Sequence, residues 1–253
     1  MQRCSKLGFT LLELLAVIAV IGLLAATLLS TLGRAKGKGQ GAVCVNNVKQ
    51  LGIGLQTFLS DHHSYPVNQL NKKPPVGSES EEFWTGQLLR DAFGIAKPST
   101  NFNQTGIWQC PSARWSSDVV KDAAFPLSSY GYNDDKYNSS FTKLSQADQM
   151  FGLQGHYNSE SKFFTPISES EVSSPSDMMA IADSFQADWV LMRRSLEAFQ
   201  EYGNVQNRHN GKGNVVFCDG HVESPKLKFL FEDTTDSALA RWNRDHQPHS
   251  NKY

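Results

Sequence analysis

Charged residues are missing from one long stretch of this 253-residue chain, because none occurs between Leu14 and Leu32. An apolar helix of that length is about enough to cross a bilayer core of roughly 30 Å at 1.5 Å per residue. The absence excludes an ordinary soluble domain for this part of the chain. It predicts a helix over residues 9–32 that lies in a lipid bilayer.

An excess of basic residues is also missing. The chain has 24 Lys and Arg against 25 Asp and Glu, a net charge of −1. Proteins that bind nucleic acid usually carry a basic patch, so no nucleic-acid partner is predicted. No nucleophile and base stand at a useful spacing, and no glycine-rich loop suits a phosphate.

One acid, Glu13, stands at the start of the apolar stretch, behind a short leader that carries Arg3 and Lys6. A carboxylate within a membrane helix costs about 2.5–3.5 kcal/mol on insertion scales, so it usually has a partner. Two interpretations are open from the residue alone: Glu13 lies hydrated near the membrane surface, or it pairs with a cation inside the membrane.

The residues around Glu13 favour the second interpretation. Residues 8–14 read Gly-Phe-Thr-Leu-Leu-Glu-Leu, which resembles the N-terminal processing signal of type IV pilins and type II secretion pseudopilins. The resemblance implies that a prepilin peptidase/N-methyltransferase cleaves between Gly8 and Phe9 and methylates the new N-terminus at Phe9. It also implies that Glu13 pairs with the N-terminal amine of a neighbouring subunit during filament assembly. Cleavage would remove Arg3 and Lys6 and change the net charge to −3.

Two simpler interpretations compete for the N-terminal segment. A secretory signal peptide has a shorter apolar region followed by a small-residue cleavage site, whereas a basic stretch follows here at residues 34–38. A plain signal anchor explains the length but not the motif. Because basic residues flank the apolar stretch on both sides, the positive-inside rule leaves the orientation open. The resemblance alone implies a head on the periplasmic, or extracytoplasmic, side of the cytoplasmic (inner) membrane.

Four segments are predicted. They are a leader (1–8), a transmembrane and filament-core helix (9–32), a glycine-weakened linker that continues as an amphipathic helix (33–62), and an exported head (63–253). Each interior glycine costs a helix about 1 kcal/mol relative to alanine, so the glycine-rich start of the linker is expected to bend or unwind unless it is a plain membrane exit.

The predicted fold class is α+β, with the long N-terminal helix packed on a small antiparallel β-sheet head with large loops, as in pilins. Apolar residues recur every three or four positions from Cys44 to Phe58, which marks one buried helix face. A short helix is expected over 83–93, a buried strand over 178–184 that ends at Asp183, and a short tail helix over 236–246.

The pattern at 214–223 predicts a β-hairpin. Asp219-Gly220 between strand-like residues is typical of a two-residue turn. That register places Cys218 opposite His221 and Phe217 opposite Val222. Phe217 and Val222 are then expected to face the core, with Cys218 and His221 on the other face.

His209 stands ten positions before Asp219-Gly220, and this His-x9-Asp-Gly spacing resembles the C-terminal signature of a processing-associated subgroup of pseudopilin-like proteins. One hypothesis is that His209 and Asp219, with Asp183 or His221, bind Ca²⁺ or another divalent metal. The alternative is that Asp219-Gly220 serves turn geometry and His209 makes a hydrogen bond across the hairpin. One histidine and one or two acids favour the alternative.

The chain has only four cysteines, and Cys4 lies in the leader. Outside the cytoplasm two of the others can pair. A disulfide between Cys44 and Cys110 is the preferred pair and would tie the head to the helix, with Cys218 left free. Three reduced thiols are the alternative.

A structural role follows from the resemblance: a subunit of a type II secretion or type IV pilus-like filament, with other pilin-like subunits and an inner-membrane assembly platform as partners.

A second hypothesis is a membrane-anchored module whose head binds a polysaccharide or a secreted cargo. It requires aromatic side chains that cluster on the surface. A third, an enzyme that uses His209, Asp219 and Asp183, requires those side chains within about 10 Å, since catalytic groups must reach one another directly or through one water. The aromatic side chains available to the second hypothesis are Trp84, Trp108, Trp115 and Trp189.

Overall fold

A computed structural model describes most of the chain. The described residues are 10–67, 83–96, 106–116, 128–133, 151–158, 160, 163–185, 190–191, 196–197, 199–205 and 207–250. The chain divides into two compact units, Met1–Gln40 and Gly41–Tyr253, which are described separately below.

One helix, α1 (Leu11–His62), contributes to both units. It is continuous through residues 33–41, so the unwound stretch predicted there is not found. The glycines of this stretch lower the helix propensity, but propensity is a weak bias that a long helix overrides. In the first unit every apolar side chain of α1 from Leu11 to Leu32 is exposed.

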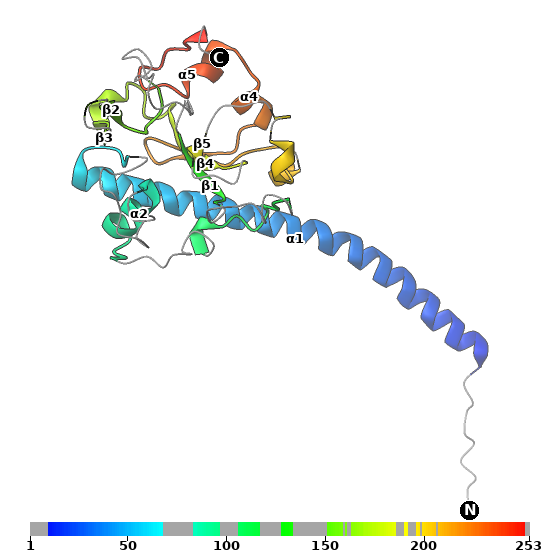
Figure 1. Cartoon of the computed structure of the whole chain (residues 1–253). Coiled ribbons are helices and arrows are strands. Elements are labelled where there is room, and N and C mark those ends of the chain that lie inside the picture. Colours follow the sequence, from blue (N-terminus) through cyan, green and yellow to red (C-terminus); the bar gives the residue numbers. More distant parts are fainter. Residues whose placement is uncertain are drawn as a thin grey trace, which may run out of the picture. The chain divides into compact units, whose positions relative to one another are not determined.

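In the second unit α1 carries the apolar face that the sequence predicts. Its buried residues recur at helical spacing, and each large one stabilises the fold by roughly 1.5–3 kcal/mol when fully buried. Figure 1 shows the sheet of the head lying against this part of α1, with α4 (Leu227–Phe231) and α5 (Asp236–Ala240) on its other side. The buried apolar side chains of α1 are Cys44, Val48, Leu51, Leu55, Phe58 and Leu59.

The head is built on a five-stranded sheet with the strand order β5-β1-β4-β6-β7. Neighbouring strands are antiparallel except for β1 and β5, which pair in parallel. The five strands are β1 (Tyr130–Asn133), β4 (Met179–Asp183), β5 (Val190–Leu191), β6 (Val215–Phe217) and β7 (Val222–Glu223). The predicted α+β class and the buried strand that ends at Asp183 are confirmed, and the parallel β5 is the exception to the antiparallel sheet.

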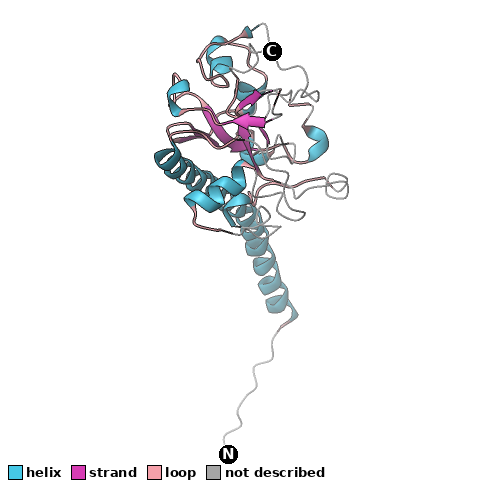
Figure 2. Cartoon of the chain, turned by 60° about the vertical axis from the view of Figure 1, so that its left-hand side comes forward, coloured by secondary structure: helices cyan, strands magenta, loops and turns pink. Residues whose placement is uncertain are grey.

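The three central strands β1, β4 and β6 are buried along their whole length, and Figure 2 shows helices around the sheet. One face packs Tyr130, Ile181 and Val216 against α1. The other packs Ala182 and Phe217 with the aromatic side chains near α4 and α5. A register shift between Met179 and Ile181 interrupts the β4–β6 pairing.

Smaller elements complete the head. The helix expected over 83–93 is present as α2 (Trp84–Gln87), which runs into a π-helical turn, η2 (Leu88–Ala92). A separate two-stranded sheet pairs β2 (His156–Asn158) with β3 (Phe163–Thr165). The tail helix α5 is shorter than predicted. The 3-10 turns are Gly106–Trp108, Glu169–Glu171, Gln200–Tyr202 and Arg208–Asn210.

The hairpin at 214–223 is present, but its predicted register is wrong by one residue. Val216 pairs with Val222, and the Phe217 N–H donates to the carbonyl of His221 at 3.0 Å. The loop therefore has three residues and ends at Gly220 with a φ of +87°, the left-handed geometry that three-residue hairpins require. Phe217 is buried as expected.

The slipped register moves Cys218 into the core, where it is 2% exposed, instead of placing it on the outer face with His221. Burial, the largest cause, raises the pKa of Cys218 to about 12, and a hydrogen bond with Tyr65 opposes this shift. The thiol is therefore protonated at neutral pH and unreactive.

The close approach of α1 to η2 requires a glycine at position 54. A Cβ placed on Gly54 would come within 2.6 Å of the Phe93 ring, whereas a Cβ on Gly41 of the same helix would meet only His209, at 3.9 Å. Gly54→Ala should therefore lower the free energy of unfolding by about 1–3 kcal/mol, as expected for overpacking. Gly41→Ala should be neutral or stabilise by up to about 1 kcal/mol.

Denaturant unfolding of the full chain in detergent measures both effects. In a Phe93→Ala background the Gly54→Ala substitution should lose its cost, because the clashing ring is gone. A cost that persists in that background would show that the ring contact is not its cause.

Candidate functional site

Glu13 caps the helix on which it lies. Its Oε2 accepts hydrogen bonds from the Thr10 backbone N–H and from the Thr10 hydroxyl, both at 2.9 Å, while the Glu13 N–H donates to that hydroxyl oxygen at 3.2 Å. This reciprocal arrangement is a capping box, which satisfies donors at the start of a helix. Gly8 and Phe9, the predicted cleavage site, lie outside the described residues.

Behind Glu13, α1 presents a long apolar surface. Among the described residues it is the one helix long and apolar enough to cross a membrane, judged by length and composition. Its apolar residues from Leu11 to Leu32 are all exposed. Soluble monomers rarely expose contiguous apolar patches larger than a few hundred Å², so this surface requires lipid or other helices around it.

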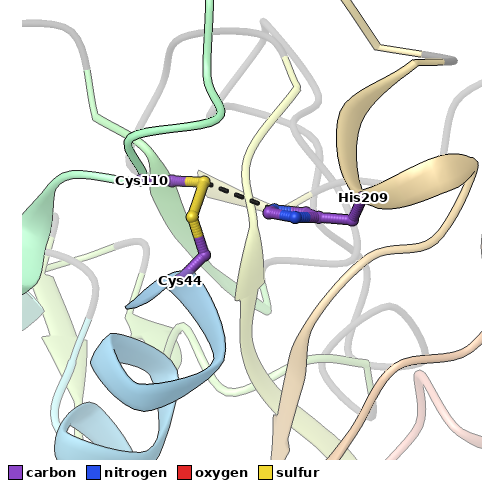
Figure 3. A group of neighbouring side chains, drawn as sticks. All are labelled: Cys44, Cys110 and His209. Atoms are coloured by element: carbon purple, nitrogen blue, oxygen red, sulfur yellow. Dashed lines mark hydrogen bonds between the residues drawn. A yellow bond between two sulfur atoms is a disulfide. The ribbon is translucent and has the colours of Figure 1, made fainter. Parts of the chain in front are cut away.

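A second group of functional side chains lies inside the head, on three separate segments. Cys44 of α1 and Cys110 of the loop after Trp108 form a disulfide with their Cα atoms 5.0 Å apart, which is the pair preferred from the sequence. Figure 3 shows the imidazole of His209 pointing at this disulfide, with Nε2 3.3 Å from the Cys110 sulfur.

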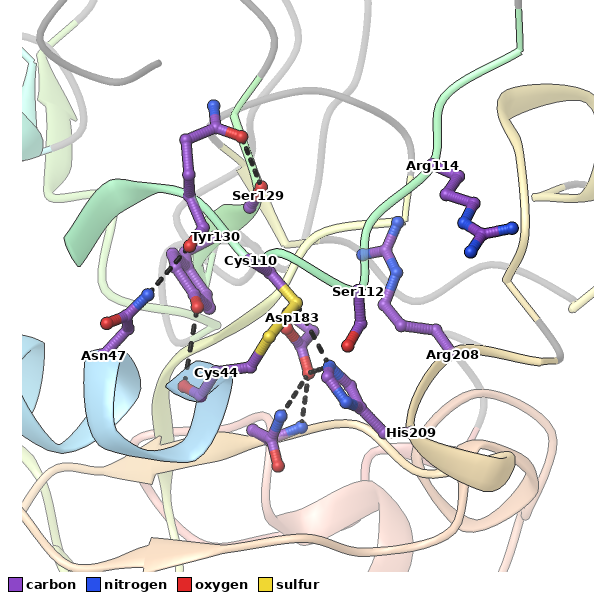
Figure 4. The surroundings of a disulfide bond; sticks show 12 residues. Cys44, Asn47, Cys110, Ser112, Arg114, Ser129, Tyr130, Asp183, Arg208 and His209 are labelled. Atoms are coloured by element: carbon purple, nitrogen blue, oxygen red, sulfur yellow. Dashed lines mark hydrogen bonds and ion pairs between the residues drawn. A yellow bond between two sulfur atoms is a disulfide. The ribbon is translucent and has the colours of Figure 1, made fainter. Parts of the chain in front are cut away.

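The same histidine nitrogen also faces Asp183, at the end of β4. His209 Nε2 lies 3.3 Å from Asp183 Oδ2, and the two side chains are 6% and 0% exposed. The carboxylate is held in place by Asn214, whose backbone N–H and side-chain amide donate to Oδ2 at 2.7 and 2.9 Å. Figure 4 shows these groups gathered around the disulfide.

Arg208 is a buried charged side chain beside this group, and the sequence did not reveal it. It is buried, donates through Nη1 to the Ser184 carbonyl at 2.7 Å, and lies over the rings of Phe185 and Trp115 at 4.7 and 4.9 Å. Burial lowers the pKa of Arg208, and the charge of Asp183 opposes this shift. Its position beside His209 in the sequence was the only available indication, since nothing in the local pattern marks it as buried.

Asp219 does not belong to this group. His209 lies beside the disulfide, at the level of Cys44 on α1. The loop that carries Asp219 lies at the level of Gln56 on the same helix, because the Gln56 side chain donates a hydrogen bond to the Cys218 carbonyl at 2.8 Å. Cys44 and Gln56 are separated by roughly 18 Å of helix. Asp219 pairs instead with His221, at 2.6 Å.

This separation overturns two hypotheses. The predicted metal site that combines His209 with Asp219 is wrong, because the two residues lie at levels of the head that are separated by roughly 18 Å along α1. The enzyme hypothesis fails for the same reason, since it needs both residues and Asp183 within about 10 Å. Calcium does not fit the His209–Asp183 pair either, because it takes six to eight oxygen ligands and this pair offers one carboxylate.

The aromatic side chains named for sugar binding are mostly interior. Trp84 and Trp108 are 0% and 4% exposed and pack edge to face with ring centroids 5.8 Å apart. Trp115 is half-buried beside Arg208, and Trp189 lies outside the described residues. Trp84 and Trp108 therefore belong to the core and supply no stacking surface for a polysaccharide.

Comparison with known proteins defines the class of the chain. Residues 3–29 match the family described as the prokaryotic N-terminal methylation motif. The chain thus carries a prepilin-type N-terminal signal, and α1, which follows it, is long and apolar enough to cross a membrane.

Curated relatives define the family more closely. The chain is 31% identical over 114 residues to type II secretion system core protein G of Escherichia coli K12, a match that covers 45% of this chain and 69% of that protein. It is 32% identical over 103 residues to the protein of the same name in Klebsiella michiganensis, covering 37% and 72%, and 27% identical over 88 residues to that of Pseudomonas aeruginosa, covering 33% and 62%. No solved structure matches the chain. The chain belongs to the type II secretion system core protein G family and is a pseudopilin.

The disulfide is expected to stabilise the head substantially, because it closes a long loop. For a sequence separation of 66 residues the chain-entropy relation gives about 4 kcal/mol, and native disulfides typically contribute 2–5 kcal/mol. The double substitution Cys44→Ala/Cys110→Ala should lower the free energy of unfolding by that amount in denaturant titrations.

Peptide mapping after alkylation in denaturant provides the matching chemical measurement. Under non-reducing conditions the peptide with Cys218 should be alkylated, and those with Cys44 and Cys110 should remain linked to each other. A Cys218 peptide linked to either partner would contradict the pairing.

Proposed function

We propose that this pseudopilin is processed between Gly8 and Phe9 and assembled, head outward, into a type II secretion filament. The observation that carries the proposal is the exposed apolar stretch of α1 with one carboxylate at its start. The proposal implies a prepilin peptidase that cleaves and methylates, an inner-membrane assembly platform, and other pilin-like subunits as neighbours. In this scheme the chain is the substrate of the peptidase and has no catalytic activity of its own.

The position of Glu13 supports a role in joining subunits. Both hydrogen bonds from Thr10 go to Oε2, and among the described residues none goes to Oε1, which is where a cation from another subunit would bind. Cleavage before Phe9 would create an amine one residue ahead of Thr10. A buried amine and a buried carboxylate offset each other's desolvation only when they are paired, so the pair selects one axial register between neighbouring helices.

The relatives support the same assignment. These relatives are named as core proteins of a type II secretion system. The orientation of the head rests on this family membership, since basic residues flank the apolar stretch on both sides.

Intact-mass and N-terminal analysis of the protein from its native membranes tests the processing step. We expect a chain that begins at N-methylated Phe9 and lacks the first eight residues. A Gly8→Leu variant should retain the leader and serves as the control for peptidase dependence. A chain that begins at Met1 in cells with an active prepilin peptidase would contradict the proposal.

The assembly role of Glu13 is tested separately by Glu13→Gln, which keeps the size of the side chain and removes its charge. The variant should be cleaved and anchored normally but should be depleted at least about tenfold from sheared filaments, which corresponds to about 1.4 kcal/mol. Ser30→Ala is the matched control, because the Ser30 hydroxyl bonds only to the Thr27 carbonyl of its own helix. Equal recovery of both variants in filaments would rule out the pairing of Glu13.

A further inference from the structure

The disulfide of the head lies against the imidazole of His209. The Cys44 and Cys110 sulfurs and a ring nitrogen of His209 lie within 4.8 Å of one another (Figure 3). Both cysteines are buried, and the His209 side chain is 6% exposed. A disulfide sulfur is only a weak hydrogen-bond acceptor, so the disulfide alone does not explain the placement of the ring.

The backbone holds the ring in this place under strain. His209, Asn210 and Gly211 have φ values of +51°, +57° and +77°, three successive residues in the left-handed region. A non-glycine residue in that region costs of order 1–3 kcal/mol, and such strain persists where the surroundings impose it, frequently at functional sites. The turn is fixed by hydrogen bonds from the Gly211 N–H to the Arg208 carbonyl and from the Leu227 N–H to the Gly211 carbonyl, both at 3.0 Å.

Asp183 adds a fourth donor beside the same nitrogen. Its Oδ2 is 3.3 Å from His209 Nε2, and its Oδ1 is fully buried without a hydrogen-bond partner. A buried carboxylate oxygen without a hydrogen-bond partner is costly. The neighbouring Arg208 is near enough for the charge of Asp183 to act on it, but its Nη1 donates to the Ser184 carbonyl, and Oδ1 keeps no hydrogen-bond partner among the described residues.

The four side chains have the composition of a zinc site. Two thiolates, an imidazole and a carboxylate are donors that zinc takes in tetrahedral geometry, at about 2.0–2.3 Å each. Those bond lengths place neighbouring donors of a tetrahedron about 3.3–3.8 Å apart. The distances from His209 Nε2 to the Cys110 sulfur and to Asp183 Oδ2, both 3.3 Å, match this spacing.

We propose that Cys44, Cys110, His209 and Asp183 form a zinc site when the disulfide is reduced. A dithiol reductant transfers two electrons and two protons to the disulfide and is itself oxidised to a disulfide. Zn²⁺ then binds both sulfurs and releases their two protons. Thiol–disulfide exchange with a second disulfide, which accepts the two electrons and is reduced to a dithiol, re-forms the Cys44–Cys110 disulfide, removes two of the four donors and releases the metal.

The consequence concerns the connection between α1 and the loop that carries Cys110. In an oxidising compartment the disulfide closes this connection, and in a reducing one the metal closes it through the same two sulfurs. The head would then keep one tertiary structure in both conditions. The proposal is independent of filament assembly, since it concerns only residues of the head.

Cobalt(II) is the probe, because it takes the same tetrahedral sites as zinc and is coloured. The full chain with Cys4→Ser is purified in detergent, reduced with a phosphine under anaerobic conditions, and titrated with Co²⁺. We expect one Co²⁺ per chain, with thiolate-to-cobalt charge-transfer absorption in the near-ultraviolet and visible bands of a tetrahedral ion. Zinc should displace it, and the oxidised chain should show neither band.

Matched variants assign the ligands. Cys110→Ser should lose the charge-transfer band that the reduced, unsubstituted site gives with Co²⁺, whereas Cys218→Ala should retain this band. His209→Gln and Asp183→Asn should each weaken binding by at least about tenfold, since even residues that only orient a ligand contribute about 10–100-fold. His221→Gln is the control, because His221 also pairs with a carboxylate, Asp219, at 2.6 Å but has no cysteine ligand beside it.

Near-ultraviolet circular dichroism distinguishes loss of the site from loss of the fold. If reduction loosens the head, one equivalent of zinc should restore the spectrum of the oxidised protein. The proposal is overturned if the reduced chain binds no Co²⁺ at one equivalent, if zinc fails to restore a loosened fold, or if His209→Gln binds as tightly as His221→Gln.

Discussion

The rest of the head depends on a single constraint, the burial of β4 on both faces. Every side chain from Met179 to Asp183 is inaccessible to solvent, so neither face of the sheet can be left open. One face is covered by α1 and the other by the aromatic cluster around α4 and α5. Because the helix that anchors the chain also completes the core, the head cannot fold without the second part of α1.

This arrangement explains why polar groups gather at the carboxyl end of β4. The strand ends at Asp183, where the core meets α1, the Cys110 loop and the turn at His209 (Figure 4). A carboxylate in that position must be satisfied by neighbours, because desolvation is costly. Asn214 donates two hydrogen bonds to the Asp183 carboxylate, and His209 lies beside it. The positive charge of the buried Arg208 interacts favourably with the same carboxylate.

The two ends of α1 serve different purposes. From Cys44 to Leu59 one face is packed against the head, while the apolar residues up to Leu32 remain exposed and end at the capped carboxylate of Glu13. A helix that is apolar all round belongs in a membrane or among other helices. Membership of the type II secretion system core protein G family accounts for both environments.

The sequence by itself determined what depends on local order: the membrane helix, the motif at residues 8–14, the apolar face of α1 and the buried strand that ends at Asp183. Periodicity and composition are properties of neighbouring residues, so they are visible in one dimension. The tertiary structure alone decided which distant side chains meet. His209 was grouped with Asp219 because of their spacing in the chain, but β4 separates them, and the slipped hairpin register buried Cys218. Neither the length of a turn nor the burial of Arg208 follows from residue type, because both depend on contacts made across the whole core.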